Sequence, residues 1–322
     1  MIRVIKPEGM GNIQLEDTPI PEINSCQVLV RTSKTLISRG SELFRRYILE
    51  EAVSPSIMGY SLTGTIEQVG SEVTEYQVGQ RVTVVAPHAQ YAVGEVDFSI
   101  KGNVVPLTEN VSFEEGTFLP LARSATAWVD SSGVKAGDQV VVLGQGVVGS
   151  LIMQLLRGCE PEQIITVDPL PLRCQLSQKL GADEVINASE VDPVDAVKQL
   201  TKGHGADLVI DCVGGYAGVK SFEQAQDMVA QRGTIQLIAL YQQQPLPLHA
   251  SKIMQKRLVA GILTDEPPIQ IAQRALDSIE RGVIQIQPMT THLFPYTEAK
   301  EAFDLLWHTP EKALGVLLDW HP

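Results

Sequence analysis

The N-terminal third of the chain alternates hydrophobic and polar positions in short runs that glycine, proline and serine separate. Runs such as CQVLVRTS, SLTGTIEQVG, QRVTVVAP and HAQYAVG have the period of two that is typical of half-buried strands. The segment SFEEGTFLPLARSATAWVDSSG instead has helical spacing, with Ser112 as its N-cap and Glu115 three residues later. The pattern predicts a mostly antiparallel β domain followed by a helix.

From residue 137 onward, apolar runs alternate with helical segments. The continuous apolar run DQVVVLG is typical of a strand covered on both faces, and QIITVD, EVIN, ADLVIDCV and GTIQLIAL follow it with helical segments between them. Repeated strand–helix units predict a doubly wound parallel sheet. The C-terminal part departs from this alternation, with two helical segments and the run KALGVLLDW, and we expect it to pack on the first domain.

Composition and charge narrow the class of protein. The chain is 44% hydrophobic and 20% charged, as in ordinary globular proteins. Its 25 Lys and Arg stand against 38 Asp and Glu, and the net charge of −13 argues against nucleic-acid and membrane partners. No apolar run has the length of a membrane span or the form of a signal peptide, so we expect a cytoplasmic location. The four cysteines are scattered without a CxxC pair, so we expect no disulfide framework and no thiolate zinc site.

A glycine pattern points to a dinucleotide. Gly144, Gly146 and Gly149 form GxGxxG between a predicted strand and a predicted helix that Val147 and Val148 begin. The first glycine allows a tight turn, the second lets a pyrophosphate approach the backbone, and the third lets helix and strand pack closely. The helix N-terminus adds the positive end of its dipole. We predict a dinucleotide site at these five residues; the alternative is a strand–helix turn without a ligand.

Four further residues extend the predicted cofactor site. Asp168 ends the next strand, where an acid accepts hydrogen bonds from ribose hydroxyls and repels the 2′-phosphate of NADP. We therefore expect NAD(H), although Arg173, five residues on, leaves open the alternative of NADP. Val213 and Gly214 follow the strand ADLVIDC at the carboxyl edge of the sheet, where we expect the nicotinamide end.

Motifs along nearly the whole chain resemble the medium-chain dehydrogenase/reductase superfamily of the alcohol dehydrogenase type. They include GQRVTVVAP, HAQYAV, LPLARSATAWVDSSGVKAGDQVVVLGQGVVG, KLGADEVIN, DLVIDCVG and TTHLFPYTEAKEAF. The resemblance implies an α/β fold with a GroES-like β domain at residues 1–124 and 264–322, a Rossmann domain at residues 125–263, and an active site in the cleft. It also implies a homodimer formed at the edge of the Rossmann sheet, for which GTIQLIAL is the expected edge strand.

The zinc-binding pattern of the superfamily is altered in this sequence. Zinc members bind the metal with a cysteine before a GTD-like turn, a histidine in a GHE segment and a second cysteine before the Rossmann domain. Here Ser38 or Arg39 stands at the first position, Tyr60 and Ser61 replace the histidine and the glutamate, and Ala122 lies near the third. We predict no metal, because these side chains do not suit zinc. The pair SRGSE and GYS is similar to a zinc-less branch that includes bacteriochlorophyllide dehydrogenases, which oxidise a 1-hydroxyethyl side chain.

Without a metal, hydrogen bonds must stabilise the oxygen of the substrate. Tyr60 is the first candidate for donor or proton relay, and an inward-pointing Arg39 would lower the pKa of its phenol. Ser41 matches a hydroxyl that relays protons in zinc members, and Ser38, three residues earlier, is a further candidate. His88 could extend a relay toward solvent. Each residue also has a structural alternative. Tyr60 could pack in the core with its hydroxyl bonded to the backbone, and Arg39 could form an ion pair with Glu42. Ser41 could be only a turn residue, and His88 could be a strand histidine whose ring nitrogens are hydrogen-bonded. Arg45 and Arg46 are expected on a solvated helix face, within possible reach of an acidic substrate.

Taken together, these residues predict an NAD-dependent oxidoreductase without zinc that transfers a hydride between nicotinamide and a small alcohol or carbonyl. Two alternatives stay open. One is an NAD(P)H-dependent reductase of enones or quinones, the class to which other zinc-less relatives belong. The other is a catalytically silent protein that only binds the dinucleotide.

Overall fold

The computed structural model describes residues 1–97, 103–239 and 245–321, and the chain divides into two compact units. The first consists of Met1–Arg123, Glu266–Gly282 and Met289–Pro322, and the second of Ser124–Asp265 and Val283–Pro288. The main divisions fall close to the expected positions after residues 124 and 263. The short segment Val283–Pro288 differs, because it belongs to the second unit, where Gln285 N donates to Gln154 Oε1 at 2.8 Å.

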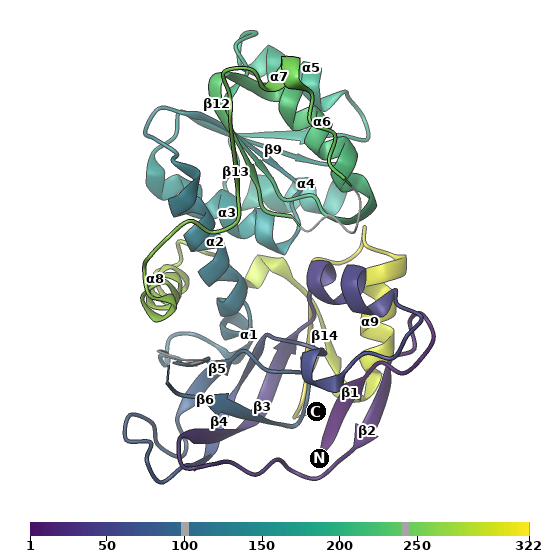
Figure 1. The fold of residues 1–322 in the computed structure, drawn as a ribbon, viewed down its shortest axis with the longest axis vertical. Helices are drawn as coiled ribbons and strands as arrows, with labels where there is room; N and C mark the ends of the chain where they lie inside the picture. Colours follow the sequence, from purple (N-terminus) through teal and green to yellow (C-terminus); the bar gives the residue numbers. More distant parts are fainter. Residues whose placement is uncertain (98–102, 240–244, 322) are drawn as a thin grey trace. The chain divides into compact units, whose positions relative to one another are not determined.

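The first unit is built on a mostly antiparallel sheet, coloured purple, blue and yellow in Figure 1. Its order over the described residues is β14-β15-β3-β4-β5-β7, with β6 paired to β3 and a separate β1–β2 pair. Only β14 and β15 run parallel among these pairs. The strands are β1 (Ile2–Ile5), β2 (Gln14–Asp17), β3 (Gln27–Leu36), β4 (Leu62–Val69), β5 (Arg81–Val84), β6 (Tyr91–Glu95), β7 (Val104–Pro106), β14 (Thr290–Pro295) and β15 (Gly315–Asp319).

The C-terminal part packs on the N-terminal sheet, as expected. Strand β15 pairs antiparallel with β3, with Leu317 opposite Leu36. At the end of the same pair, Lys34 Nζ donates to Asp319 Oδ1 at 2.8 Å, and Trp320 Nε1 donates to Thr35 Oγ1 at 3.0 Å. The first unit is therefore complete only when both ends of the chain are present.

The predicted capping box is confirmed, but the helix after it is interrupted. Ser112 Oγ accepts from Glu115 N at 3.1 Å, and Glu115 Oε2 accepts from Ser112 N at 2.9 Å. Helix α1 nevertheless ends at Gly116 and α2 begins at Leu119, because Pro120 has no amide hydrogen to continue one helix. The helices that begin in this unit are η1 (Arg39–Tyr47), η2 (Pro55–Ile57), α1 (Phe113–Gly116), α2 (Leu119–Ser132), α8 (Pro268–Glu280), η6 (Tyr296–Glu298) and α9 (Ala299–His308).

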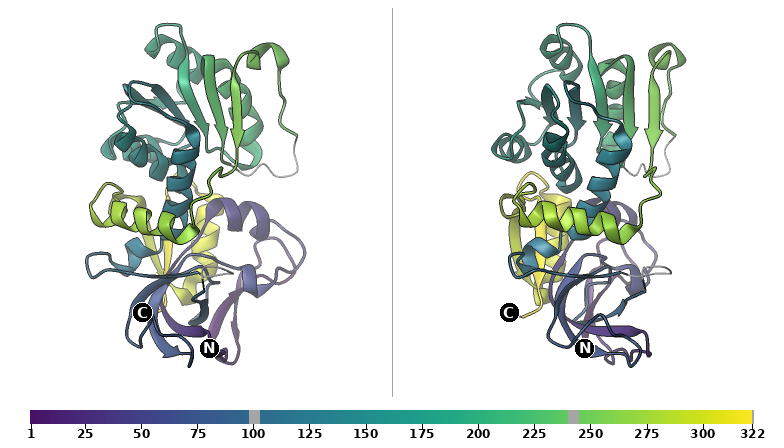
Figure 2. Two further views of the ribbon diagram at one scale, coloured as in Figure 1. Left: turned by 60° about the vertical axis from the view of Figure 1, so that its left-hand side comes forward. Right: turned by 90° about the vertical axis from the view of Figure 1, so that its left-hand side faces the viewer.

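The second unit is a doubly wound parallel sheet with helices packed on both of its faces (Figures 1 and 2). Over the described residues its order is β10-β9-β8-β11-β12-β13, the order of dinucleotide-binding folds. The strands are β8 (Gln139–Leu143), β9 (Gln163–Asp168), β10 (Glu184–Asn187), β11 (Ala206–Asp211), β12 (Val229–Leu237) and β13 (Arg257–Ala260). The helices are α3 (Val147–Leu156), η3 (Arg157–Cys159), α4 (Pro171–Lys179), α5 (Pro193–Leu200), η4 (Gly215–Ala217), α6 (Gly218–Met228) and α7 (Ala250–Ile253); η5 (Gln287–Met289) begins in this unit as well.

The expected edge strand of this sheet was wrong. The first five residues of the run GTIQLIAL end β12, which lies between β11 and β13, and the final residue Leu240 is outside the described residues. Strand β13 pairs with it from Thr234–Arg257 to Leu237–Ala260 and forms the edge. Within the described ranges, no helix combines the length and the apolar character needed to cross a membrane.

Candidate functional site

The glycine turn after β8 has the geometry that its spacing predicts. Gly144 has φ +83°, and a Cβ there would lie 2.7 Å from Val213 Cγ2. A Cβ on Gly149 would lie 1.9 Å from the Gly144 carbonyl oxygen, so α3 could not pack on the turn. At Gly146 a Cβ would meet no described atom within 4 Å, which leaves open space beside the backbone. The first and third glycines are required by packing, and the middle one leaves room for a ligand.

Helix α3 presents its first amides beside this space. Gly146 is the N-cap and has no side chain to cap the helix, and the first turn holds no acidic residue. The amides of Val147 and Val148 lie in that turn, where backbone N–H groups have no partner within the helix. Such amides and the helix dipole bind phosphate groups, so this turn fits a pyrophosphate.

Asp168 lies at the end of β9, next to the same turn. It is buried, and its carboxylate accepts from Gln145 N at 2.8 Å and from Leu170 N at 2.9 Å. Arg173 Nη1 lies 3.5 Å from Asp168 Oδ2, while Arg173 Nε is buried without a partner among the described residues. The structure thus brings together Asp168, whose carboxylate can accept from ribose hydroxyls, and Arg173, whose guanidinium can bind a phosphate.

Gln145 is a residue of this site that the sequence reasoning missed. It is buried, its Nε2 donates to Val142 O at 3.2 Å, and its Oε1 accepts from Ser177 Oγ at 3.1 Å. Its side chain therefore ties the glycine turn to β8 and α4, while its amide holds Asp168. Its place between two glycines of the motif was the signal in the sequence.

Val213 and Gly214 follow β11 at the carboxyl edge of the sheet. Val213 N donates to Asp211 Oδ1 at 3.1 Å, and Ser221 Oγ donates to the same oxygen at 2.8 Å. Because Val213 also lies against Gly144, the structure joins this loop to the glycine turn. Val213 therefore lies beside the glycine turn, and Asp168 is bonded to the same turn through the Gln145 amide.

In the first unit, Gly59 makes the bend that precedes Tyr60. Its φ is +105°, and a Cβ there would lie 2.6 Å from the His88 amide nitrogen and 2.9 Å from two ring carbons of His88. Only glycine allows this backbone conformation and this close approach together. The bend places Tyr60 ahead of β4.

The structure brings together three of the predicted hydroxyl residues. Tyr60 Oη donates to Ser38 Oγ at 2.8 Å, and Ser41 N donates to the same Ser38 oxygen at 3.3 Å. Burial raises the pKa of Tyr60, and the charge of Glu42 adds to this rise, while the hydrogen bonds to Ser38 and Ser41 and the charge of Arg46 oppose it. The lowered phenol pKa that we expected is therefore wrong, and Tyr60 is a neutral donor at neutral pH.

The cation that acts on this phenol is Arg46. It donates to the carbonyl of Ile57, and its charge lowers the pKa of Tyr60 against the effect of burial. Arg39 instead donates through Nε to Leu306 O at 3.3 Å, and its guanidinium lies 4.8 Å from the centre of the Phe44 ring. We expected Arg39 to lower the pKa of the Tyr60 phenol, but the arginine of η1 that lowers it is Arg46.

His88 is buried rather than directed to solvent. Its side chain is 0% exposed, and Nε2 lies 2.8 Å from Glu42 Oε1. The other oxygen of Glu42 accepts from Ser38 N at 2.8 Å. The expected relay from His88 to solvent is contradicted by this burial, and Glu42 contacts His88 and the Ser38 amide. Glu42, one residue after Ser41, was considered in the sequence only as a partner for Arg39.

The positions that bind zinc in the superfamily do not fit that metal here. Ser38 and Tyr60 offer hydroxyls that bond to each other, and the buried Ala122 has no donor atom. Zinc in proteins prefers thiolate, imidazole and carboxylate ligands. Among the residues that the structure describes, no three His, Cys, Asp or Glu side chains gather around a possible metal position.

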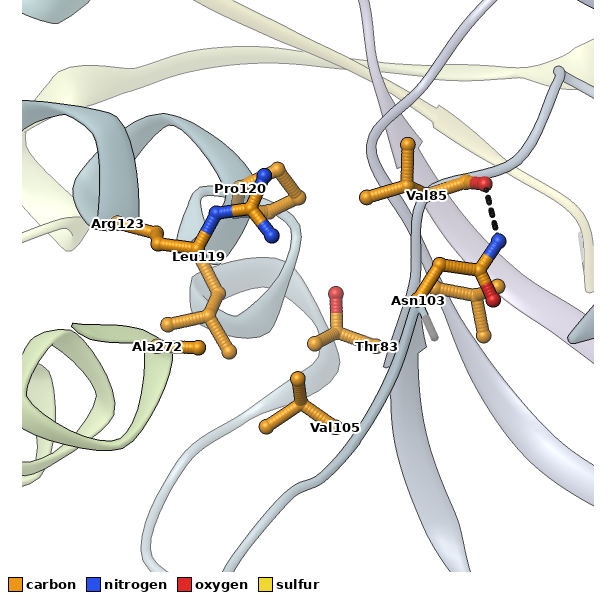
Figure 3. A pocket seen from close by; sticks show the side chains of 9 residues that line it. Thr83, Val85, Asn103, Val105, Leu119, Pro120, Arg123 and Ala272 are labelled. Carbon is orange, nitrogen blue, oxygen red and sulfur yellow. Dashed lines mark hydrogen bonds between the residues drawn. The ribbon is translucent and has the colours of Figure 1, made fainter. Parts of the chain in front are cut away.

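A hollow elsewhere in the first unit is distinct from these hydroxyls (Figure 3). It is mostly apolar, and Asn103 on its wall donates to Val85 O at 2.9 Å. Arg123 borders it, and burial lowers the pKa of its guanidinium. None of the residues that line it belongs to the Tyr60–Ser38 group. The lining residues are Thr83, Val84, Val85, Asn103, Val105, Leu119, Pro120, Arg123 and Ala272.

Sequence comparison agrees with both units. Residues 24–118 match the family described as alcohol dehydrogenase GroES-like domain, and residues 147–280 match the family described as zinc-binding dehydrogenase. Both matches are to domains of the alcohol dehydrogenase-like medium-chain dehydrogenase/reductase superfamily, and they support the resemblance seen in the sequence. An alcohol dehydrogenase from Cupriavidus necator is 25% identical over 97% of this chain and 96% of its own length.

Solved structures of other members share the fold of this dehydrogenase. A short chain alcohol dehydrogenase from Escherichia coli CFT073, complexed with NADH, has a TM-score of 0.84 and 20% identity over 99% of each chain. A zinc-binding dehydrogenase from Sinorhizobium meliloti 1021, bound to NADP, has a TM-score of 0.82 and 21% identity over 99% of each chain. The expected fold class, a GroES-like β domain with a Rossmann domain, is confirmed.

Proposed function

We propose that this dehydrogenase interconverts an alcohol and a carbonyl compound with NAD(H) and without zinc. The observation that carries the proposal is the 2.8 Å hydrogen bond from Tyr60 Oη to Ser38 Oγ. These hydroxyls stand at two positions where zinc members of the superfamily hold their metal. Hydrogen-bond donors aimed at a substrate oxygen can stabilise developing charge there, which is the task that a Lewis acid otherwise performs.

The proposed preference for NAD(H) rests on Asp168. Its carboxylate is fixed by two backbone amides beside the glycine turn, where a ribose hydroxyl can donate to it and a 2′-phosphate is repelled. Arg173 lies within 3.5 Å of this carboxylate, so part of its charge is compensated there. Relatives of the same fold have been solved with NADH and with NADP, so the adenosine-ribose end must decide the preference in each chain.

The chemistry of the hydroxyl pair follows from its protonation state. A nicotinamide dinucleotide held at the glycine turn by Gly146, Val147 and Val148 would supply hydride transfer to or from the substrate carbon. During oxidation, Tyr60 would take the hydroxyl proton of the alcohol while its own proton passes to Ser38 Oγ, and Ser38 would release its own hydroxyl proton to water. During reduction, the neutral phenol donates to the carbonyl oxygen. General acid–base help of this kind contributes about 10²–10⁴-fold to a rate.

A substrate panel tests this function. The protein is dialysed against a chelator, its residual metal is measured, and primary and secondary alcohols are offered with NAD⁺ or NADP⁺. We expect alcohol-dependent formation of NADH that the chelator does not reduce. Turnover of enones or quinones alone would show that the protein is a reductase of those compounds. Tight NAD binding without any turnover would show that it is a catalytically silent dinucleotide-binding protein.

We also propose a homodimer formed along β13. This strand is the edge of the parallel sheet, and apolar side chains on and beside it are exposed. Leu258 on the strand is 45% exposed, and Met254, Ile262 and Leu263 flank it with 65%, 44% and 65%. An exposed edge strand with apolar side chains is a surface for a second strand, and two-fold pairing of identical edges closes the assembly.

A further inference from the structure

Two ionisable side chains, Glu42 and His88, are completely buried next to the Tyr60–Ser38 pair. Both are 0% exposed, and Glu42 Oε1 lies 2.8 Å from His88 Nε2. A carboxylate is costly to bury unless each oxygen has a partner. Here the second oxygen accepts from Ser38 N at 2.8 Å, so both are satisfied.

These contacts form one line that ends at the phenol. His88 contacts Glu42, Glu42 holds the amide of Ser38, and Ser38 Oγ accepts from Tyr60 Oη. The backbone amide and the hydroxyl of Ser38 are therefore engaged from opposite directions. A shift of the Glu42 carboxylate would move the residue that accepts the proton of Tyr60.

The ring of His88 is held on several sides. Its amide donates to Met58 O at 2.7 Å, its ring lies against Gly59, and its edge meets Phe303 at 6.0 Å between centroids and 88° between planes. These contacts fix the ring while leaving Nε2 free to face Glu42. His88 therefore gives the carboxylate a partner of fixed position.

Hydrogen-bond counting assigns the proton of this imidazole. His88 Nδ1 is buried without a partner among the described residues. An imidazolium would carry a second N–H at Nδ1 with no acceptor, whereas the neutral tautomer with its proton on Nε2 leaves only a lone pair there. The neutral Nε2–H tautomer therefore donates to a charged Glu42.

We propose that Glu42 and His88 are positioning residues, which hold Ser38 so that its hydroxyl oxygen remains the acceptor of the Tyr60 proton. The inference rests on the proposed function in what it assigns to Tyr60, but the geometry that it explains exists without substrate. Glu42 acts through the Ser38 amide, in addition to the direct effect of its charge on the Tyr60 pKa, and His88 acts through Glu42. Neither residue is required to touch the substrate.

The first test reads the phenol directly and needs no turnover. Tyrosine labelled with carbon-13 at Cζ gives one signal for each ring, and Tyr60→Phe identifies the signal of Tyr60. We expect Glu42→Gln to shift this signal in the same direction as Ser38→Ala. The control Asp304→Ala removes the acceptor of Tyr47, whose hydroxyl donates to Asp304 Oδ1 at 2.7 Å, and should shift only the Tyr47 signal. An unmoved Tyr60 signal in folded Glu42→Gln overturns the proposal.

A pair of His88 variants covers the case in which Glu42→Gln does not fold. His88→Gln keeps an N–H donor for Glu42, and His88→Leu removes it. We expect the Tyr60 signal to stay near its wild-type position in His88→Gln and to move in His88→Leu. Equal shifts in the two variants would show that only the volume of the ring matters, which contradicts the proposal.

The second test is a double-mutant cycle with a working substrate. We expect Glu42→Gln to lower kcat about tenfold while KM for NAD stays unchanged, because positioning acts on the chemical step. In the Ser38→Ala background the same change should alter kcat by no more than about twofold, because the path from Glu42 to the phenol is already broken. Full additivity of the two losses overturns the inference. If the wild type shows no turnover, the proposed function fails, and the tyrosine signals still decide this inference.

Discussion

Tyr60 Oη lies 2.8 Å from Ser38 Oγ and donates its proton to it, although the two residues belong to segments on either side of η1. The contact joins the residue after the Gly59 bend to the residue that caps η1. Burial keeps the phenol protonated, so the pair acts as a donor and an acceptor rather than as a phenolate.

Tyr60→Phe should remove the donor without disturbing the cofactor. We expect kcat to fall by about 10²–10⁴-fold with the best alcohol substrate, because a general acid–base group is lost. The dissociation constant for NAD, measured by fluorescence titration, should stay unchanged. Tyr76→Phe is the matched control, since its hydroxyl donates to Val104 O at 2.9 Å elsewhere in the same unit. Equal kcat values for Tyr60→Phe and the wild type would remove Tyr60 from the mechanism.

Asp168→Ser should move the cofactor preference toward NADP. The change removes the carboxylate that favours a ribose diol and repels a 2′-phosphate. We expect the ratio of kcat/KM for NAD to that for NADP to fall about tenfold or more, which corresponds to about 1.4 kcal/mol. Asp183→Ser, which breaks an ion pair with Arg157 in the same unit, should leave the ratio unchanged. An unaltered ratio in Asp168→Ser would assign the preference to another residue.

Gly59→Ala should destabilise the first unit. The added methyl group would meet the backbone and ring of His88 at a residue with φ +105°. We expect the free energy of unfolding to fall by roughly 2–4 kcal/mol, from backbone strain and overpacking together. Gly79→Ala has φ +88° with open space around it and should cost only the strain, roughly 1–2 kcal/mol. Urea unfolding followed by tryptophan fluorescence measures both, and similar losses would contradict a specific role of His88.

The protein should lose stability in alkaline solution. Burial raises the pKa of Tyr47 and of Tyr60 above the ordinary value near 10, so the folded state keeps protons that the unfolded state releases. The free energy of unfolding should therefore be unaffected below pH 10 and should fall from there up to the raised folded values. Tyr47→Phe should make this fall shallower, whereas Tyr216→Phe, at a ring that is 71% exposed, should not. Urea titrations at several pH values between 8 and 11.5 measure the slope.

Leu258→Asp should convert the proposed dimer to a monomer. A carboxylate on the edge strand would be buried without a partner when a second copy pairs with it. Light scattering coupled to size-exclusion chromatography gives the mass of each form. Leu293→Asp is the matched control, because Leu293 is 48% exposed on β14, the edge of the other sheet. A wild-type monomer, or a dimer that survives Leu258→Asp, would disprove pairing along β13.

The glycine turn could be predicted because each of its requirements is local. Gly144, Gly146 and Gly149 are set by the backbone of one strand–turn–helix unit, and Asp168 follows at the end of the next strand. Their spacing in the sequence therefore already describes their arrangement in space. The capping box of Ser112 and Glu115 was predicted for the same reason.

The contacts around Tyr60 could be predicted only in part, because they depend on distant segments. Glu42 and His88 are 46 residues apart in sequence, and no periodicity links them. The choice between Arg39 and Arg46 was missed because η1 has π-helical geometry, so its side chains do not follow the usual helical spacing. Strand β13 was missed because RLVA is short and mostly exposed, without the apolar run of an interior strand.

The pairing of β15 with β3 has a consequence for protein synthesis. A ribosome releases β3 and both segments of the second unit, residues 124–265 and 283–288, before it makes β15, so the second unit can fold while the first still lacks a strand. During that interval the β15 side of β3 has unpaired backbone groups, which can template association with other chains. Nascent chains should therefore depend on chaperones most strongly between the completion of residue 288 and the arrival of residue 319.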